Sequence, residues 1–159
     1  MKIESTHKII PSYSLDEELV YGLRITDFAE AAGEDLRNPI LRHQQRDNQE
    51  PRDVHIATFG ELMATSQVMR AVKQAEFRFA DYGELRGLWL DSHPKRAVAI
   101  LPSEIEFHTK VIYQAGQTNK PCTLCLFSML GQGFELCWLP YDFEDIWDRF
   151  WGFLVVREG

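Results

Sequence analysis

The sequence has few cysteines, no long apolar run and no excess of basic residues. Its 159 residues include three cysteines, an odd number that does not make a disulfide framework. Every apolar run is shorter than the roughly 20 residues that a membrane-spanning helix needs. Residues 1–10 lack the apolar stretch of a secretory signal and instead carry Lys2, Glu4, His7 and Lys8. These features predict a cytoplasmic protein with no membrane association.

Basic residues are outnumbered by acidic ones, 17 to 24, which gives a net charge of −7. The charge is uneven along the chain, with −5 over residues 1–65, +2 over 66–99 and −4 over 100–159. Nucleic-acid binding draws on clustered Lys and Arg, so this composition disfavours it. An acidic surface instead favours encounter with a basic protein.

Catalytic motifs are also missing from the sequence. It contains no G-x-S-x-G, H-E-x-x-H or phosphate-binding G-x-x-x-x-G-K-[ST] pattern, and no G-x-G-x-x-G follows a predicted strand. The acid-x-His pairs at His55 and His93 are short patterns that arise often in loops. Whether the protein is an enzyme stays open, with the balance against it, and no cofactor is indicated.

The composition is that of one ordinary domain spanning residues 1–159, with 45% hydrophobic residues. Its first half reads as helical. Ser14 and Glu17 have the spacing of a capping box, which predicts N-terminal helices between Ser14 and Ala32.

Residues 42–53 have no large apolar side chain and predict a flexible polar loop. A second capping box, Thr58 with Glu61, predicts a helix over 59–77 whose buried stripe holds Phe59, Leu62, Met63, Met69 and Val72.

The second half shows alternating patterns. Strands are predicted at 87–91, 96–101, 105–114, 122–130 and 134–140. The last two form a hairpin around residues 131–133, with Leu126 opposite Trp138 and Phe127 opposite Cys137. Both faces of this hairpin are apolar, which places it centrally in the sheet.

The C-terminal segment begins at Asp142, a good N-cap. Helical spacing puts one apolar face on Phe143, Ile146, Trp147, Phe150 and Leu154. A strand at residues 155–156 is the alternative. The predicted fold is therefore α+β, with N-terminal helices, a five-stranded antiparallel meander sheet and a C-terminal helix packed on the sheet.

Two more specific interpretations receive less support from the residues. A zinc site could use Cys122, Cys125, Cys137 and His108. However, residues three apart in a strand point to opposite faces, so no metal is predicted. Residues 58–101 could form a winged helix that binds nucleic acid, with residues 91–96 as the wing, but their cations are dispersed.

Aromatic residues make up 12% of the chain and gather near its C-terminus. We expect most of them to fill the core, while a surplus lines an interface or a ligand pocket. A homodimer is predicted, because Trp151 and one face of the hairpin have no evident cover within the chain. The candidate interface or ligand residues are Phe127, Phe134, Trp138, Trp147 and Trp151.

Two functional hypotheses follow. The first is a non-enzymatic, acidic cytosolic interaction module that binds another macromolecule, such as a basic protein, as an accessory, inhibitor or neutralising partner. The second is a small-molecule-binding protein or small enzyme, with an apolar or aromatic ligand in an aromatic-lined pocket between sheet and helices.

Overall fold

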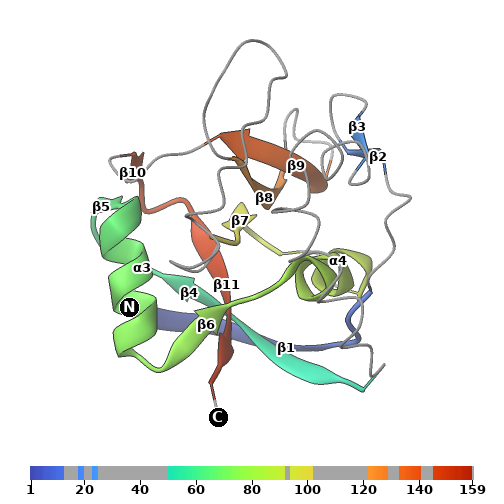
Figure 1. Cartoon of the computed structure of the whole chain (residues 1–159), viewed down its shortest axis with the longest axis horizontal. Coiled ribbons are helices and arrows are strands. Elements are labelled where there is room, and N and C mark those ends of the chain that lie inside the picture. Colours follow the sequence, from blue (N-terminus) through green and yellow to red (C-terminus); the bar gives the residue numbers. More distant parts are fainter. Residues whose placement is uncertain are drawn as a thin grey trace, which may run out of the picture.

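The computed structural model describes residues 1–12, 18–19, 23–24, 50–91, 94–101, 122–128, 133–140 and 145–158. Within these residues the chain forms two helices and eleven strands. Seven of the strands make one mixed sheet, and the other four make two small two-stranded sheets (Figure 1). The protein thus has an α+β fold, as predicted.

The large sheet has the order β1-β4-β11-β7-β8-β9, and β6 also pairs with β11. All of its pairs are antiparallel except β7 with β11, which is parallel. The sheet is therefore not a simple meander. Its strands are β1 (Lys2–Ile9), β4 (Arg52–Thr58), β6 (Phe77–Phe79), β7 (Val98–Ala99), β8 (Cys122–Phe127), β9 (Glu135–Pro140) and β11 (Gly152–Arg157).

Strand β11 lies at the centre of this sheet. One edge pairs with β4, and the other pairs first with β7 and then with β6. Its side chains alternate between two apolar clusters. Phe153 and Val155 belong to one cluster, and Leu154 belongs to the other with Val156 packed against it. All of β11 from Gly152 to Val155 is buried.

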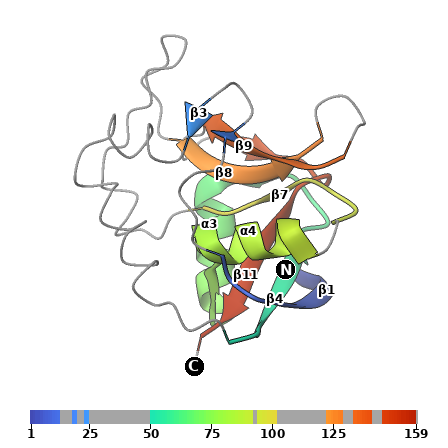
Figure 2. The same ribbon diagram turned by 90° about the vertical axis from the view of Figure 1, so that its right-hand side faces the viewer.

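Each face of the sheet is covered by one helix. Helix α3 (Thr65–Gln74) buries Val68, Met69 and Val72 in the cluster that contains Phe153. Helix α4 (Tyr82–Asp91) buries Leu85 and Leu88 in the cluster that contains Leu154. Figure 1 shows the two helices on opposite sides of β11, and Figure 2 shows α4 on the side that faces the viewer. Neither described helix is long and apolar enough to cross a bilayer.

One small sheet pairs two segments that are far apart in the chain, and the other pairs two segments that are close together. Strand β5 (Met63–Ala64) pairs with β10 (Ile146–Trp147), beside the start of α3. Strand β2 (Glu18–Leu19) pairs with β3 (Leu23–Arg24).

The predicted N-terminal helices are wrong where the structure describes this region. Residues 18–19 and 23–24 are paired strands and not helical turns. Gly22 lies between them and is the second-worst helix former after proline. The rest of 13–49, including most of the predicted polar loop, lies outside the described residues, and Arg52 and Asp53 at the end of that loop begin β4.

The predicted helix over 59–77 is confirmed in its centre but is shorter, because α3 begins at Thr65. The predicted cap at Thr58 ends β4 instead. The helix start is stabilised by Gln67, whose Oε1 accepts a hydrogen bond of 2.8 Å from the Ala64 amide. Phe59 is buried as predicted, but it precedes the helix.

The strand predicted at 87–91 is wrong, since these residues belong to α4. The decisive feature is a capping box at the start of that helix. The Glu84 amide donates to Asp81 Oδ1 at 2.8 Å, and the Asp81 amide donates to Glu84 Oε1 at 2.9 Å. Among the other predicted strands, 96–101 is confirmed only at β7, and 105–114 lies outside the described residues.

The predicted C-terminal helix is wrong, because residues 146–147 and 152–157 are strands. The alternative of a strand at residues 155–156 is confirmed. A close approach fixes this segment in the sheet, since a Cβ on Gly152 would lie 2.7 Å from Ile56 Cγ2. The two β-branched valines also favour a strand over a helix.

The predicted hairpin is confirmed as β8 and β9, but its register is two residues off. Leu126 lies opposite Leu136, Leu124 opposite Trp138 and Cys125 opposite Cys137. The shift by two keeps each side chain on its expected face. Among the described strands the hairpin does not take the predicted central position, because β9 ends their order.

A buried carboxylate joins α4 to the two strands β4 and β6. Glu84 is fully buried, and its two oxygens accept hydrogen bonds of 2.8 and 3.0 Å from the Arg78 guanidinium. Arg52 Nη1 of β4 lies 3.5 Å from Glu84 Oε2. Burial raises the pKa of Glu84, but Arg78, the Asp81 amide and the charge of Arg52 together hold this pKa below its usual value.

Removing this carboxylate is expected to destabilise the protein strongly. In a Glu84→Ala variant we expect a loss of about 3–5 kcal/mol in the free energy of unfolding, because Arg78 and Arg52 lose their counter-ion. Urea denaturation would measure this loss.

The ionised carboxylate of Glu84 stabilises the fold at pH values above its ordinary pKa, and this stabilisation is lost as the pH falls through the lowered pKa of the folded protein. Equal acid sensitivity of wild type and Glu84→Gln below pH 4.5 would contradict this role.

The register of β8 and β9 can be tested by oxidation. Opposite residues in an antiparallel pair have Cα atoms about 4.5–5.5 Å apart, within the range of about 4.4–6.8 Å that a disulfide spans. We expect diamide to link Cys125 to Cys137 in unfolding–refolding cycles, identified by peptide mass spectrometry. A link from Cys137 to Cys122 would contradict the register, and Cys125→Ser is the control that must abolish the link.

Candidate functional site

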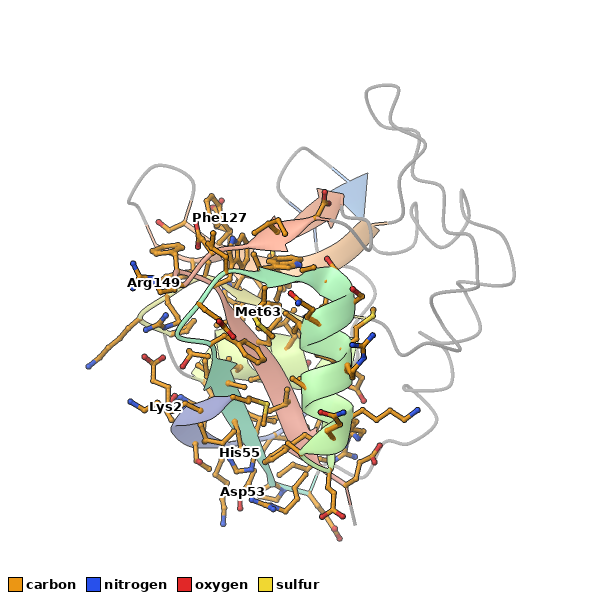
Figure 3. All side chains as sticks on the ribbon, turned by 90° about the vertical axis from the view of Figure 1, so that its left-hand side faces the viewer. Lys2, Asp53, His55, Met63, Phe127 and Arg149 are labelled. Atoms are coloured by element: carbon orange, nitrogen blue, oxygen red, sulfur yellow. The ribbon has the colours of Figure 1, made fainter. Side chains whose placement is uncertain are left out.

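Three of the five predicted site residues lie together at one end of the sheet. The Phe127 ring stacks on Trp151 at a centroid distance of 5.7 Å, and Trp147 meets Trp151 edge-on at 5.1 Å. Trp147 also packs edge-on against Phe153 of β11, at 5.2 Å. Figure 3 shows Phe127 at this end of the molecule, with Met63 and Arg149 near it. We call Phe127, Trp147 and Trp151 the aromatic cluster.

Of the other two predicted residues, the structure places the side chain of Phe134 elsewhere. Phe134 packs against the opposite apolar cluster, and its carbonyl oxygen accepts a 3.0 Å hydrogen bond from Trp89 Nε1 of α4. Trp138 lies on β9 opposite Leu124, and its side chain is outside the described residues. The structure therefore does not bring all five residues into one site.

The aromatic cluster is fixed to the start of α3 by a buried hydroxyl. Trp147 is only 5% exposed, and its Nε1 donates a hydrogen bond of 2.8 Å to Thr65 Oγ1. Thr65 is itself fully buried, and its amide donates to the Asp145 carbonyl at 3.0 Å. The Thr65 hydroxyl also donates to that carbonyl, at 3.3 Å. The Thr65 hydroxyl thus bonds the residue before β10, Asp145, and the last residue of β10, Trp147.

Trp151 is covered by other aromatic rings of the same chain. Trp151 was expected to lack cover within the chain, which was one reason to predict a homodimer. Instead Phe127 stacks on it and Trp147 contacts it edge-on, leaving it half-buried. Such pairs contribute about 0.5–1.5 kcal/mol beyond area burial. The rings are thus used in packing against one another.

Three exposed large apolar side chains lie on or beside the segments that form β5 and β10. Among the described residues, Leu62 is 65% exposed, Ile146 61% and Phe150 56%. Leu62 immediately precedes β5, Ile146 opens β10, and Phe150 follows β10 in the turn that leads to β11. We call these three residues the β5–β10 patch.

Strand geometry explains why this patch points outward. Trp147 pairs with Met63, and Ile146 pairs with Ala64. Because alternate residues face opposite sides of a strand, the burial of Trp147 turns Ile146 away from the core. The same alternation puts Leu62 on the side of Ala64 and Ile146. The Phe150 amide donates to Asp148 Oδ1 at 2.8 Å, which forms the adjoining turn.

The sequence prediction placed all three patch residues on buried helix faces, which is wrong. With a period of 3.6, Leu62 falls on the stripe of Met69, and Ile146 and Phe150 fall with Trp147. With the period of two that a strand has, Leu62 and Ile146 instead point away from their buried or half-buried neighbours Met63 and Trp147. The short Asp-Ile-Trp-Asp run at 145–148, apolar within acidic neighbours, was the available signal for a surface segment.

Acidic residues stand on the same segments as the patch residues. Glu61 and Asp148 are exposed and Asp145 is half-buried. Arg149 is the exposed basic residue of the same segments, so residues 60–62 and 145–151 carry three acidic and one basic side chain. Nearby, Arg96 bonds Glu4 at 2.5 Å and donates to the carbonyls of residues 149 and 150.

Of the two less supported interpretations, the winged helix loses its structural basis and the zinc site gains none. A winged helix in 58–101 needs a hairpin after its recognition helix, but residues 82–91 are helical. In the part of the chain that the structure describes, no three His, Cys, Asp or Glu residues group as metal ligands. His108 and the side chains of Cys122 and Cys137 lie outside that part, whereas Cys125 is buried in the core.

No known protein family matches the chain, and no curated protein or solved structure matches it.

One histidine has an environment that shifts its titration. His55 Nδ1 lies 2.8 Å from Thr6 Oγ1, and its ring meets Phe77 edge-on at 5.5 Å. Burial lowers the pKa of His55 below 6.5, and the charge of Arg157 lowers it further, while Asp53 acts in the opposite direction. His55 is therefore mostly neutral at neutral pH. Figure 3 shows it with Asp53 at the end of the sheet away from Phe127.

Replacing His55 is expected to change the pH dependence of stability. The unfolded chain takes up the proton near pH 6.5 and the folded chain only at lower pH, so stability is lost as the pH falls. A His55→Asn variant should lose less stability than wild type between about pH 7.5 and about pH 5.5. Thermal unfolding followed by circular dichroism would measure this. A larger loss in the variant would show that His55 stabilises the fold when protonated.

Proposed function

We propose that this protein is a non-enzymatic, acidic cytoplasmic interaction module that docks another protein chain on the β5–β10 patch. The observation that carries the proposal is the exposure of Leu62, Ile146 and Phe150 on adjoining segments of the surface. Exposed large apolar side chains are common singly, but a group of them is typical of a binding surface. The cytoplasmic location rests on the three cysteines and on the burial of Cys125 as a core residue.

The packing beneath the patch supports docking at this position. The patch stands on the aromatic cluster, and the Thr65 hydroxyl holds β10 against the start of α3. A surface that is ordered before binding loses little conformational entropy when a partner covers it. The pocket hypothesis has weaker support, since the predicted pocket residues Phe127, Trp147 and Trp151 pack on one another.

The proposal can be tested with a displayed library of random peptides selected on the immobilised wild-type protein. Affinities of the selected peptides would be measured by fluorescence anisotropy for wild type and for the double variant Ile146→Ser/Phe150→Ser. We expect the double variant to bind at least about tenfold more weakly, because each lost apolar side chain removes about 1.5–3 kcal/mol when fully buried.

Leu90→Ser is the matched control. Leu90 is 58% exposed on α4, close to the exposure of the patch residues, and lies outside both β5 and β10. It should bind as wild type does. Failure to select any peptide, or equal losses in the control and the double variant, would count against docking at the patch.

A further inference from the structure

We infer that Arg96 and Glu4 are positioning residues for the β5–β10 patch, and that together they hold Phe150 in the conformation in which a partner chain binds it. This inference rests on the proposed function and adds two charged residues that lie outside the patch. Its basis is that side chains bond both main-chain polar groups of Phe150.

The turn that carries Phe150 is held by hydrogen bonds on both sides of this residue. The Phe150 amide donates to Asp148 Oδ1 at 2.8 Å, and the Phe150 carbonyl accepts from Arg96 Nη1 at 3.4 Å. The same Nη1 donates to the Arg149 carbonyl at 3.0 Å. The Trp151 amide donates to the Asp148 carbonyl at 3.3 Å. The backbone is therefore fixed even though the Phe150 side chain is 56% exposed.

Arg96 is itself held by strand β1 and by packing. Its Nη2 lies 2.5 Å from Glu4 Oε1, so one guanidinium joins β1 to the turn before β11. Its aliphatic stem lies against Gly152, where a Cβ would come within 3.1 Å of Arg96 Cδ. Hydrogen bonds between a guanidinium and a carboxylate are about twice as strong as those between neutral groups. These contacts leave the Arg96 guanidinium little freedom to turn away from the two carbonyls.

A β-bulge explains how Glu4 reaches Arg96. The register between β1 and β4 shifts by one residue between Ile3, which lies opposite Ala57, and Ser5, which lies opposite Ile56. Glu4 is the extra residue at this shift. A bulge bends its strand and re-aims a side chain. Glu4 is exposed, and its carboxylate is aimed at Arg96.

The positions of these bonds predict which rate constant of binding depends on Arg96. If the turn is loosened, only a fraction of the molecules present Phe150 correctly, and the apparent affinity falls by that fraction. The contacts in the bound complex stay the same, so the loss falls on association. Removal of a side chain that contacts the partner instead speeds dissociation. The two kinds of residue can therefore be told apart by kinetics.

The test measures association and dissociation of the peptides selected on the wild-type protein, by surface plasmon resonance. Methionine in Arg96→Met keeps the stem against Gly152 and removes the guanidinium. We expect this variant to associate about tenfold more slowly, with dissociation unchanged. Glu4→Gln keeps an acceptor oxygen and should slow association by only about threefold. Ile146→Ser/Phe150→Ser should speed dissociation.

Arg70→Met is the matched control for the loss of a guanidinium. Arg70 is exposed on α3 and is expected to bind the peptides as wild type does after this change. Thermal unfolding of each variant shows that binding is measured on folded protein.

Amide hydrogen exchange, followed by NMR in the free protein, reports on the turn without any partner. We expect Arg96→Met to speed exchange of the Phe150 and Trp151 amides by about tenfold, because the turn opens more often. The Val72 amide in α3 should exchange at the same rate in the variant and in wild type.

The outcomes separate the two proposals. Unchanged exchange of the Phe150 amide in Arg96→Met would show that Arg96 does not order the turn, whether or not the patch binds peptides. If exchange speeds up but association does not slow, while Ile146→Ser/Phe150→Ser loses binding, docking stands and the positioning role is wrong. Faster dissociation from Arg96→Met would make Arg96 a contact residue. If Ile146→Ser/Phe150→Ser binds as wild type does, docking at the patch is wrong and the positioning role falls with it.

Discussion

Both faces of strand β11 must be covered, and the remainder of the described structure is arranged to do so. Four consecutive residues from Gly152 to Val155 are buried, with Phe153 and Val155 on one face and Leu154 on the other. A strand of this kind needs neighbours on both edges and an apolar layer on both sides. Strands β4, β6 and β7 provide the edges, and helices α3 and α4 provide the layers.

The proposed docking surface is a by-product of this arrangement. Trp147 joins the layer that contains Phe153, and its neighbour Ile146 must then face solvent because β10 is extended. Burial of one aromatic ring thus exposes the adjacent aliphatic side chain. A single segment, 145–151, therefore supplies both a support for the core and a surface for a partner.

Sequence reasoning predicted what depends on local pattern and missed what depends on neighbours in space. The α+β class, the centre of α3 and the β8–β9 hairpin follow from apolar spacing and were confirmed. The Asp81–Glu84 capping box has the spacing of a helix start, but the pattern at residues 87–91 predicts a strand where the structure has the second half of α4. The C-terminal helix failed because the apolar run through Trp151, Phe153 and Leu154 fits either period. Only partners from distant strands decide in favour of a strand. The three residues of the aromatic cluster were among the predicted interface or ligand residues, but their packing on one another was not predicted. The patch depends on the pairing of β5 with β10.

The position of β11 also affects how the chain folds. Phe153 pairs with Ala57, which precedes it by about a hundred positions, and such distant contacts slow folding because a large loop must close first. During synthesis, β4, β7 and both helices leave the ribosome before the strand that joins them. Until residues 152–157 arrive, the apolar faces of α3 and α4 have no sheet centre to pack on. A chain in which β11 has not yet paired therefore exposes apolar surface and strand edges, the features that make partly folded states prone to aggregate.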